Sequence, residues 1–73
     1  MHAEIVAKVE ASFPDAQVNV ELDGNRAVVE VVSTAFADMS RVRKQQAVYS
    51  CINEFIADGR LHAVTIRAEV PAA

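Results

Sequence analysis

Residues 17–32, QVNVELDGNRAVVEVV, decide the fold, because they have the pattern of two strands joined by a tight turn. The first half alternates apolar and polar side chains, and this period of two fits a half-buried strand. Asp23-Gly24-Asn25 supplies residues that tolerate a positive φ, and the valine-rich residues 26–32 follow as the second strand. Because both faces of this second strand are apolar, we expect it to be the central strand of a sheet.

Helices are predicted on both sides of this hairpin. Residues 2–13 carry apolar side chains at the spacing of an amphipathic helix. A short connector with one helical turn follows the hairpin, and Asp38 or Ser40 then caps a long helix over residues 41–57, which ends at Gly59. The apolar side of this long helix is expected to consist of Val42, Val48, Tyr49, Ile52, Phe55 and Ile56.

A third strand is expected over residues 61–70, where apolar side chains again alternate with polar ones. A strand–helix–strand crossover makes its two strands parallel when they are neighbours in one sheet. The predicted fold class is therefore α+β, a three-stranded mixed sheet with the helices packed on one face. A chain of 73 residues holds one domain, residues 1–73, and has no room for a large enclosed active site.

The composition argues against several classes of protein. Seven Lys and Arg against ten Asp and Glu give a net charge of −3, which disfavours a general grip on nucleic acid. The single cysteine cannot form an internal disulfide, and no apolar run approaches the ~20 residues of a membrane span. No nucleophile motif, phosphate-binding loop or dinucleotide fingerprint is present. We therefore expect a cytoplasmic, non-enzymatic binding module without a membrane segment.

His62 is the most informative single residue, because it lies at the start of the last predicted strand, at the rim of the sheet where the strands end. Two interpretations are open: one ring nitrogen bonds a nearby backbone carbonyl, or the imidazole binds a metal. Cys51 is expected to be a partly buried small hydrophobic residue. His2 lies near the end of the chain, and we expect it to be exposed and not held in place.

Arg41, Arg43 and Lys44 form a basic cluster at the start of the long helix. Cations at a helix N-terminus oppose the helix dipole, so the cluster is either a solvated face or a contact for an anion, RNA or an acidic partner. The aromatic residues are Phe13, Phe36, Tyr49 and Phe55, and periodicity assigns most of them to the core. Exposed aromatic rings on which bases would stack are therefore not evident.

The second half of the chain resembles the BolA family. The run FADMSRVRKQQAVY at residues 36–49, followed by Glu54, by GRLHAVTI at residues 59–66 and by Pro71, is similar to that family in spacing and residue type. Its Lys-Gln-Gln form resembles the acid-stress branch. The resemblance implies the element order α-β-β-α-α-β and a fold similar to the type II KH domain.

The resemblance also implies a function. Members of the family partner monothiol glutaredoxins and share a bridging [2Fe-2S] cluster with glutathione, and His62 occupies the position of the family's cluster-ligating histidine. We therefore expect an adaptor in iron–sulfur cluster trafficking or regulation, with no cofactor in the isolated chain, which would be a monomer or weak homodimer. The alternative is a KH-like nucleic-acid-binding transcriptional regulator of a stress response, with contacts from Arg41, Arg43 and Lys44.

This sequence departs from the family pattern at two places. Relatives commonly have a second Cys or His ligand near the first hairpin loop, but residues 23–27 contain neither, and Arg26 stands where a histidine would be expected. Cys51 lies on the long helix and does not match that position. Asp38 replaces the glycine that usually precedes Met-Ser. A second ligand is therefore absent, replaced by water, or supplied by the partner.

Overall fold

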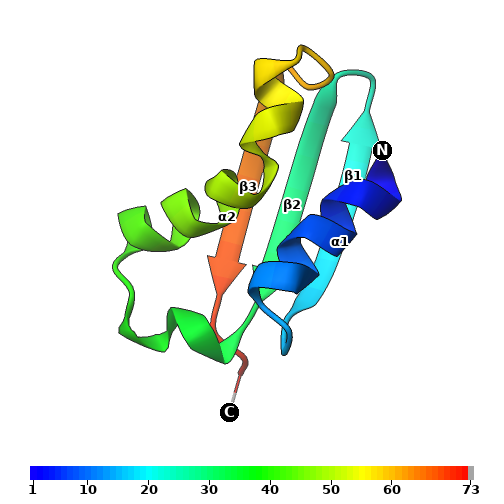
Figure 1. The fold of residues 1–73 in the computed structure, drawn as a ribbon. Helices are drawn as coiled ribbons and strands as arrows, with labels where there is room; N and C mark the ends of the chain where they lie inside the picture. Colours follow the sequence, from blue (N-terminus) through cyan, green and yellow to red (C-terminus); the bar gives the residue numbers. More distant parts are fainter. Residues whose placement is uncertain (73) are drawn as a thin grey trace.

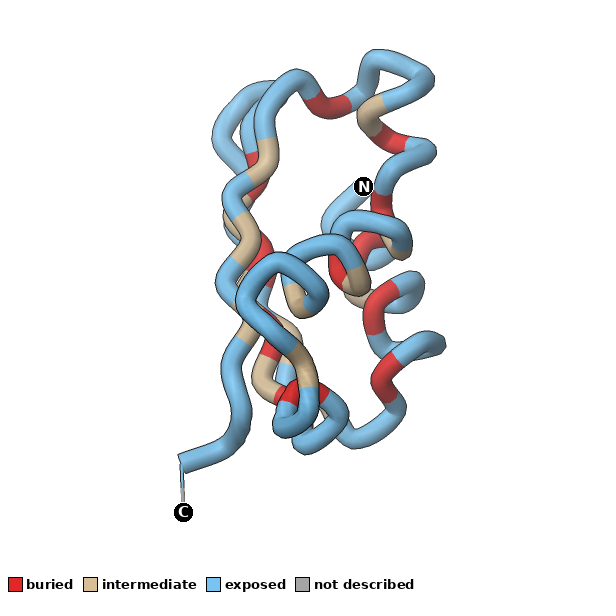
Figure 2. Tube along the Cα trace, turned by 90° about the vertical axis from the view of Figure 1, so that its left-hand side faces the viewer, coloured by how far each residue is buried: buried red, intermediate tan, exposed pale blue. Residues whose placement is uncertain are grey.

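The computed structural model describes residues 1–72, in which three strands form one sheet and the helices cover one of its faces (Figure 1). Seen from the side, the strands and the helices form two layers (Figure 2). This architecture confirms the predicted α+β class. In chain order the elements are α1 (His2–Ser12), β1 (Gln17–Asp23), β2 (Arg26–Val32), the short 3-10 helix η1 (Thr34–Asp38), α2 (Arg41–Ala57) and β3 (Ala63–Glu69).

The hairpin β1–β2 turns at Gly24 and Asn25, because Asp23 pairs with Arg26 across the ladder. Gly24 has φ 59°, whereas Asn25 has a negative φ. A positive φ at the first central residue alone matches a type II′ turn, whose twist suits a two-residue hairpin. The predicted turn is confirmed, and it needs glycine at this position.

The central position of β2 is also confirmed. The strand order is β1-β2-β3, with β1 antiparallel and β3 parallel to β2. On the face that meets the helices, Val20, Val29 and Ile66 lie in one row across the sheet. β3 is therefore an edge strand, and its outer side has no neighbouring strand.

The core lies between the sheet and the helices. Phe13 and Phe36 pack with ring centroids 5.0 Å apart. The buried apolar residues, shown in red in Figure 2, are Ile5, Val9, Phe13, Val20, Ala27, Val29, Val31, Phe36, Val48, Ile52, Phe55 and Leu61.

The prediction for the apolar side of α2 was wrong at two residues. Val42 is 64% exposed and Tyr49 is 42% exposed. At 100° per residue, both lie roughly 100–120° around the helix from Val48, which packs on the sheet. Neither side chain belongs to the core, and Tyr49 lines a hollow with Val64 and Ile66 of β3.

Both ends of α2 are defined by local hydrogen bonds. Ser40 is the N-cap, and its Oγ accepts the backbone N–H of Arg43 at 3.2 Å. At the other end Gly59 has φ 85° and donates its N–H to the carbonyl of Ile56 at 3.2 Å. Leu61, only 1% exposed, donates its N–H to Phe55 at 2.9 Å. The predicted left-handed glycine is confirmed, and it turns the chain towards β3.

Asp15 links the turn after α1 to the connector after β2. Its carboxylate accepts the hydroxyls of Ser33 at 2.8 Å and Thr34 at 2.7 Å, and the backbone N–H of Thr34 at 3.0 Å. These donors, Thr34 first, lower the pKa of Asp15 below its ordinary value of 3.8. Buried Ser33 also donates its N–H to the carbonyl of Glu69 at 3.0 Å, which fixes the end of β3.

Candidate functional site

His62 lies at one end of the sheet, where the β1–β2 hairpin meets the loop between α2 and β3. We call this end the rim and define it as residues 23–26 and 58–62. The N–H of His62 donates to the carbonyl of Asn25 at 2.8 Å, and the N–H of Ala63 reaches the same carbonyl at 3.4 Å. The backbone of His62 is thus anchored to the hairpin while its side chain is exposed.

The imidazole of His62 makes no hydrogen bond within residues 1–72. The interpretation in which one ring nitrogen bonds a backbone carbonyl is therefore wrong for His62. It is His2 that has this arrangement, because its Nε2 bonds the carbonyl of Val20 at 2.9 Å. His2 is exposed as expected, but the expectation that it is not held was wrong, since this contact joins α1 to β1.

Arg60 holds the loop that precedes His62. Its Nε donates to Asp58 Oδ2 at 2.8 Å, and its backbone N–H donates to Asp58 Oδ1 at 3.1 Å. The guanidinium lies 4.2 Å from the centre of the Phe55 ring, within the range of a cation–π contact. The loop is therefore fixed to the last turn of α2 on one side of His62, as the hairpin fixes it on the other.

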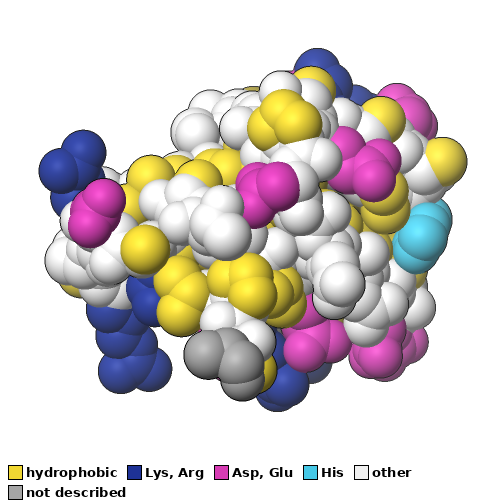
Figure 3. Space-filling view, turned by 90° about the horizontal axis from the view of Figure 1, so that it is seen from below, with side chains coloured by type: hydrophobic (Ala, Val, Ile, Leu, Met, Phe, Trp, Pro, Cys, Tyr) yellow, Lys and Arg dark blue, Asp and Glu magenta, His cyan; other side chains and the backbone are white. Residues whose placement is uncertain are grey.

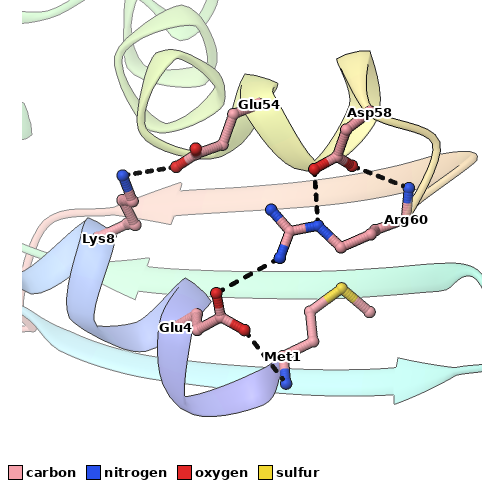
Figure 4. Close-up of polar contacts among 6 residues, drawn as sticks. All are labelled: Met1, Glu4, Lys8, Glu54, Asp58 and Arg60. Carbon is pink, nitrogen blue, oxygen red and sulfur yellow. Dashed lines mark hydrogen bonds and ion pairs between the residues drawn. The ribbon is translucent and has the colours of Figure 1, made fainter.

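The same arginine connects the loop to α1 (Figure 4). Arg60 Nη1 lies 3.4 Å from Glu4 Oε2, and the other oxygen of Glu4 lies 3.7 Å from the amino group of Met1. A second ion pair, Lys8 with Glu54, joins α1 to α2 directly. These contacts are exposed and individually weak, and they link both helices to each other and to the loop of the rim.

The rim does not contain a complete set of metal ligands. Among residues 1–72, no group of three or more His, Cys, Asp or Glu side chains could hold a metal ion. Cys51 is half-buried on α2, as predicted, and its thiol donates to the carbonyl of Ala47 at 3.3 Å. Within the rim, the described residues therefore offer one exposed imidazole, that of His62.

The three cations of the predicted basic cluster, Arg41, Arg43 and Lys44, do not share one surface. Arg41 and Lys44 line a groove of about 330 Å³ between α2 and the outer edge of β3, whereas Arg43 does not. Within residues 1–72 none of the three cations pairs with a carboxylate. The groove lies beside the C-terminal half of β3, while His62 precedes the first residue of that strand, so the groove and the rim are separate surfaces.

The rim thus presents an exposed histidine on an anchored backbone, at one end of a small α+β domain. The chain belongs to the BolA-like family, whose family model, described as BolA-like protein, matches residues 10–73. This membership assigns it to the regulatory and adaptor proteins of the BolA type. Within residues 1–72 no helix is both long and apolar enough to cross a membrane.

Two similar proteins extend the comparison. The chain is 50% identical over 56 residues to the acid stress protein IbaG of Escherichia coli (strain K12), covering 77% of this chain and 67% of that protein. It is 41% identical over 69 residues to an uncharacterized protein of the rpoN-murA intergenic region of Acinetobacter guillouiae, covering 93% and 83%. The resemblance to the acid-stress branch of the family is thereby confirmed.

Solved structures confirm the fold. BolA1 from Arabidopsis thaliana superposes with a TM-score of 0.83 at 23% identity, covering 96% of this chain and 90% of that one. The BolA domain of SufE1 from the same plant gives 0.86 at 24% identity, covering 96% and 91%. The mixed sheet and the helices on one face are therefore features shared with these BolA proteins.

Proposed function

We propose that this chain is a non-enzymatic, cytoplasmic adaptor in iron–sulfur cluster trafficking or regulation. It binds a monothiol glutaredoxin, and the two proteins share a [2Fe-2S] cluster to which glutathione also contributes. His62 supplies the imidazole ligand from this side. The observation that carries the proposal is the exposed ring of His62, without a hydrogen bond in residues 1–72, on a backbone anchored to Asn25.

The donor set fits a shared cluster and does not fit one held by this chain alone. A [2Fe-2S] cluster needs four protein or thiol ligands. The rim offers one imidazole, and the half-buried thiol of Cys51 is occupied by a carbonyl on α2. The remaining ligands must therefore come from the partner and from glutathione. Replacing a thiolate with a neutral imidazole raises the reduction potential of such a cluster, which suits a regulatory or transfer role.

The β1–β2 hairpin beside His62 offers no second metal ligand. Its two-residue loop, Gly24-Asn25, is short and carries no Cys or His. Arg26 pairs in register with Ala63, directly after His62. Arg26 also pairs in register with Asp23, so its charge is balanced at the rim. The proposal therefore requires no second ligand from this hairpin.

The test is anaerobic reconstitution of the heterocomplex. A monothiol glutaredoxin, this protein, ferrous iron, sulfide and glutathione are mixed, and the visible circular dichroism is recorded against glutaredoxin alone. We expect wild type to change the spectrum and His62→Ala to abolish most of that change. His2→Ala is the matched control, because it removes the other imidazole and should leave the heterocomplex spectrum unaltered.

If His62→Ala gives the wild-type heterocomplex spectrum, the ligand role is wrong. If the two apoproteins associate equally well with and without iron, and His62→Ala has no effect on either, the chain is a protein-binding module that uses no cluster. Iron and sulfide analysis of the co-purified pair gives an independent count of what the complex holds.

A second candidate function is the KH-like nucleic-acid-binding regulator. The observation in its favour is that Arg41 and Lys44 line one groove. The net charge of −3 opposes it, as does the absence from the sequence of the Gly-x-x-Gly loop through which type II KH domains grip RNA. Titration of labelled DNA or RNA at several salt concentrations would support it if binding is tighter than about 1 µM at physiological salt and is lost in Lys44→Glu.

A further inference from the structure

We propose that the outer edge of β3 binds an extended, acidic segment of a partner protein as a fourth strand of the sheet. The segment would pair with the backbone of β3 and lie in the groove between β3 and α2. This proposal does not depend on the cluster, because the groove is a different surface from the rim that carries His62.

The backbone of β3 has free hydrogen-bonding groups on its outer side. In a parallel ladder, alternate residues direct both N–H and C=O towards the same neighbour. Ala63 donates to Asn25 and Glu69 accepts from Ser33, so residues 63, 65, 67 and 69 face β2. The N–H and C=O groups of Val64, Ile66 and Ala68 therefore point away from the sheet. An edge of this kind is a template for a further strand.

The groove beside this edge has an apolar end. A hollow of about 340 Å³ is lined by Gln45, Gln46, Tyr49, Val64 and Ile66. It is continuous with the basic groove described above, since Gln45 and Ile66 line both. A view from below shows hydrophobic side chains exposed beside projecting basic ones (Figure 3). The outward position of Tyr49, which differs from the sequence prediction, is explained if its ring contacts a bound segment.

The other end of the groove is basic. Arg41 and Lys44 come from the first turn of α2 and have no carboxylate partner within residues 1–72. Two unpaired cations on a protein of net charge −3 favour an acidic ligand at this place. Arg67 and Glu69 also line the groove, but they belong to the set of β3 side chains that alternates onto the open face of the sheet, where Arg67 lies 3.9 Å from Glu30.

A peptide fits these features better than a nucleic acid does. Nucleic-acid affinity depends on many phosphate contacts and on aromatic stacking, whereas this groove offers two unpaired cations and one exposed aromatic ring, that of Tyr49. The unpaired donors and acceptors of Val64, Ile66 and Ala68 alternate at the repeat of a strand, which a peptide backbone matches and a sugar–phosphate backbone does not.

The geometry also determines the pattern of the segment. Side chains of an added strand that face α2 recur every second residue. The basic end lies beside Ala68 and the apolar end beside Val64 and Ile66. The segment should therefore carry an Asp or Glu two or four positions away from a β-branched or aromatic residue, with no proline between them.

The experiment is a selection of random octapeptides displayed on phage against the purified full chain, followed by synthesis of the enriched peptides. Their binding is measured by fluorescence anisotropy and mapped by ¹⁵N NMR. We expect the enriched peptides to show the acidic and apolar spacing above. The amides of Val64, Ile66 and Ala68 should shift and become protected from hydrogen exchange. Methylating the peptide nitrogens that face β3 should abolish binding.

Two variants on α2 form a matched pair. Lys44→Glu changes a groove cation and should weaken binding on the order of tenfold, because it replaces an attraction by a repulsion. Arg43→Glu makes the same charge change in the same helical turn, outside the groove, and should have little effect. Tyr49→Ala, at an exposed position, should weaken binding by removing the apolar contact.

Several results would overturn the proposal. One is failure to obtain any peptide with a Kd below about 100 µM. Another is a set of binders that map to residues other than β3 and α2. A labelled decathymidylate or decauridylate that shifts the same amides at lower concentration than the peptides would assign the groove to nucleic acid. Concentration-dependent shifts of the β3 amides in the free protein would assign the edge to a second copy of this chain.

Discussion

Replacing Gly59 with alanine isolates the backbone contribution to the end of α2. Gly59 has φ 85°, a conformation that L-residues with a Cβ rarely adopt, and no atom lies within 4 Å of the position that a Cβ would take. The substitution therefore adds no steric clash and removes no contact. Any loss of stability must come from the left-handed conformation itself.

The expected magnitude follows from two opposing effects. Holding an L-residue in the left-handed region costs about 1–2 kcal/mol. Alanine also restricts the unfolded chain relative to glycine, which returns about 0.4–1 kcal/mol. The midpoints of these two ranges leave a loss of about 0.8 kcal/mol in the free energy of unfolding, within limits of about 0–1.6 kcal/mol. For a domain of this size the central value corresponds to a fall in Tm of about 3–6 °C.

Urea denaturation followed by far-UV circular dichroism measures this difference, with thermal unfolding as a second measurement. Gly59→Asn is the control, because asparagine tolerates the left-handed region and should cost less than alanine. Hydrogen exchange at the N–H of His62 reports whether the loop still reaches Asn25. A Gly59→Ala protein more stable than wild type, or one destabilised by more than about 3 kcal/mol, would refute the reasoning, because the left-handed conformation alone accounts for neither result.

Three further predictions concern other parts of the fold. Asp15→Asn should be destabilised relative to wild type above pH 4. Hydrogen bonds from Thr34 and Ser33 lower the pKa of Asp15 in the folded state, so the extra stability of wild type is present above the ordinary pKa of 3.8. It is lost as the pH falls through the folded pKa. Urea unfolding between pH 7 and pH 3 should show the difference in unfolding free energy between the two proteins becoming smaller. Ile52→Ala removes a side chain with 0% exposure and should lower the free energy of unfolding by about 2–5 kcal/mol in denaturant titrations, whereas a neutral result would contradict the assigned core. Ser40→Ala should cost about 0.5–2 kcal/mol by removing the N-cap of α2, and an unchanged unfolding curve would mean that water replaces the cap.

Local patterns were sufficient to predict most of the fold. The hairpin, its turn at Gly24, the two α-helices and the glycine that ends α2 all depend on residues close together in sequence. Of the two predicted N-cap candidates for α2, Asp38 and Ser40, the structure has Ser40. The predicted central position of β2 already makes β3 an edge strand, but no local signal specifies where α2 lies relative to that edge. The exposure of Val42 and Tyr49 was missed for the same reason, since their burial depends on where the sheet ends.

The candidate site was also predicted only in part from the sequence. The rim position of His62 followed from its place after the glycine that ends α2, but the role of a ligand rested on a family resemblance. The bond from His2 to Val20 links positions 18 residues apart, and no local pattern indicates it. The separation of Arg43 from Arg41 and Lys44 needed the position of β3, because helical periodicity alone does not say which side of a helix meets a sheet edge.

The parallel pairing of β2 and β3 has a consequence for the order in which the molecule folds. Arg26 pairs with Ala63, 37 positions later in the chain, whereas β1 and β2 are joined by a two-residue turn. Closing a long loop before its contacts can form is slow, so we expect the hairpin to form before β3 docks. Both His62 and the outer edge of β3 belong to the late segment. We therefore expect both surfaces to form only once β3 has joined the sheet.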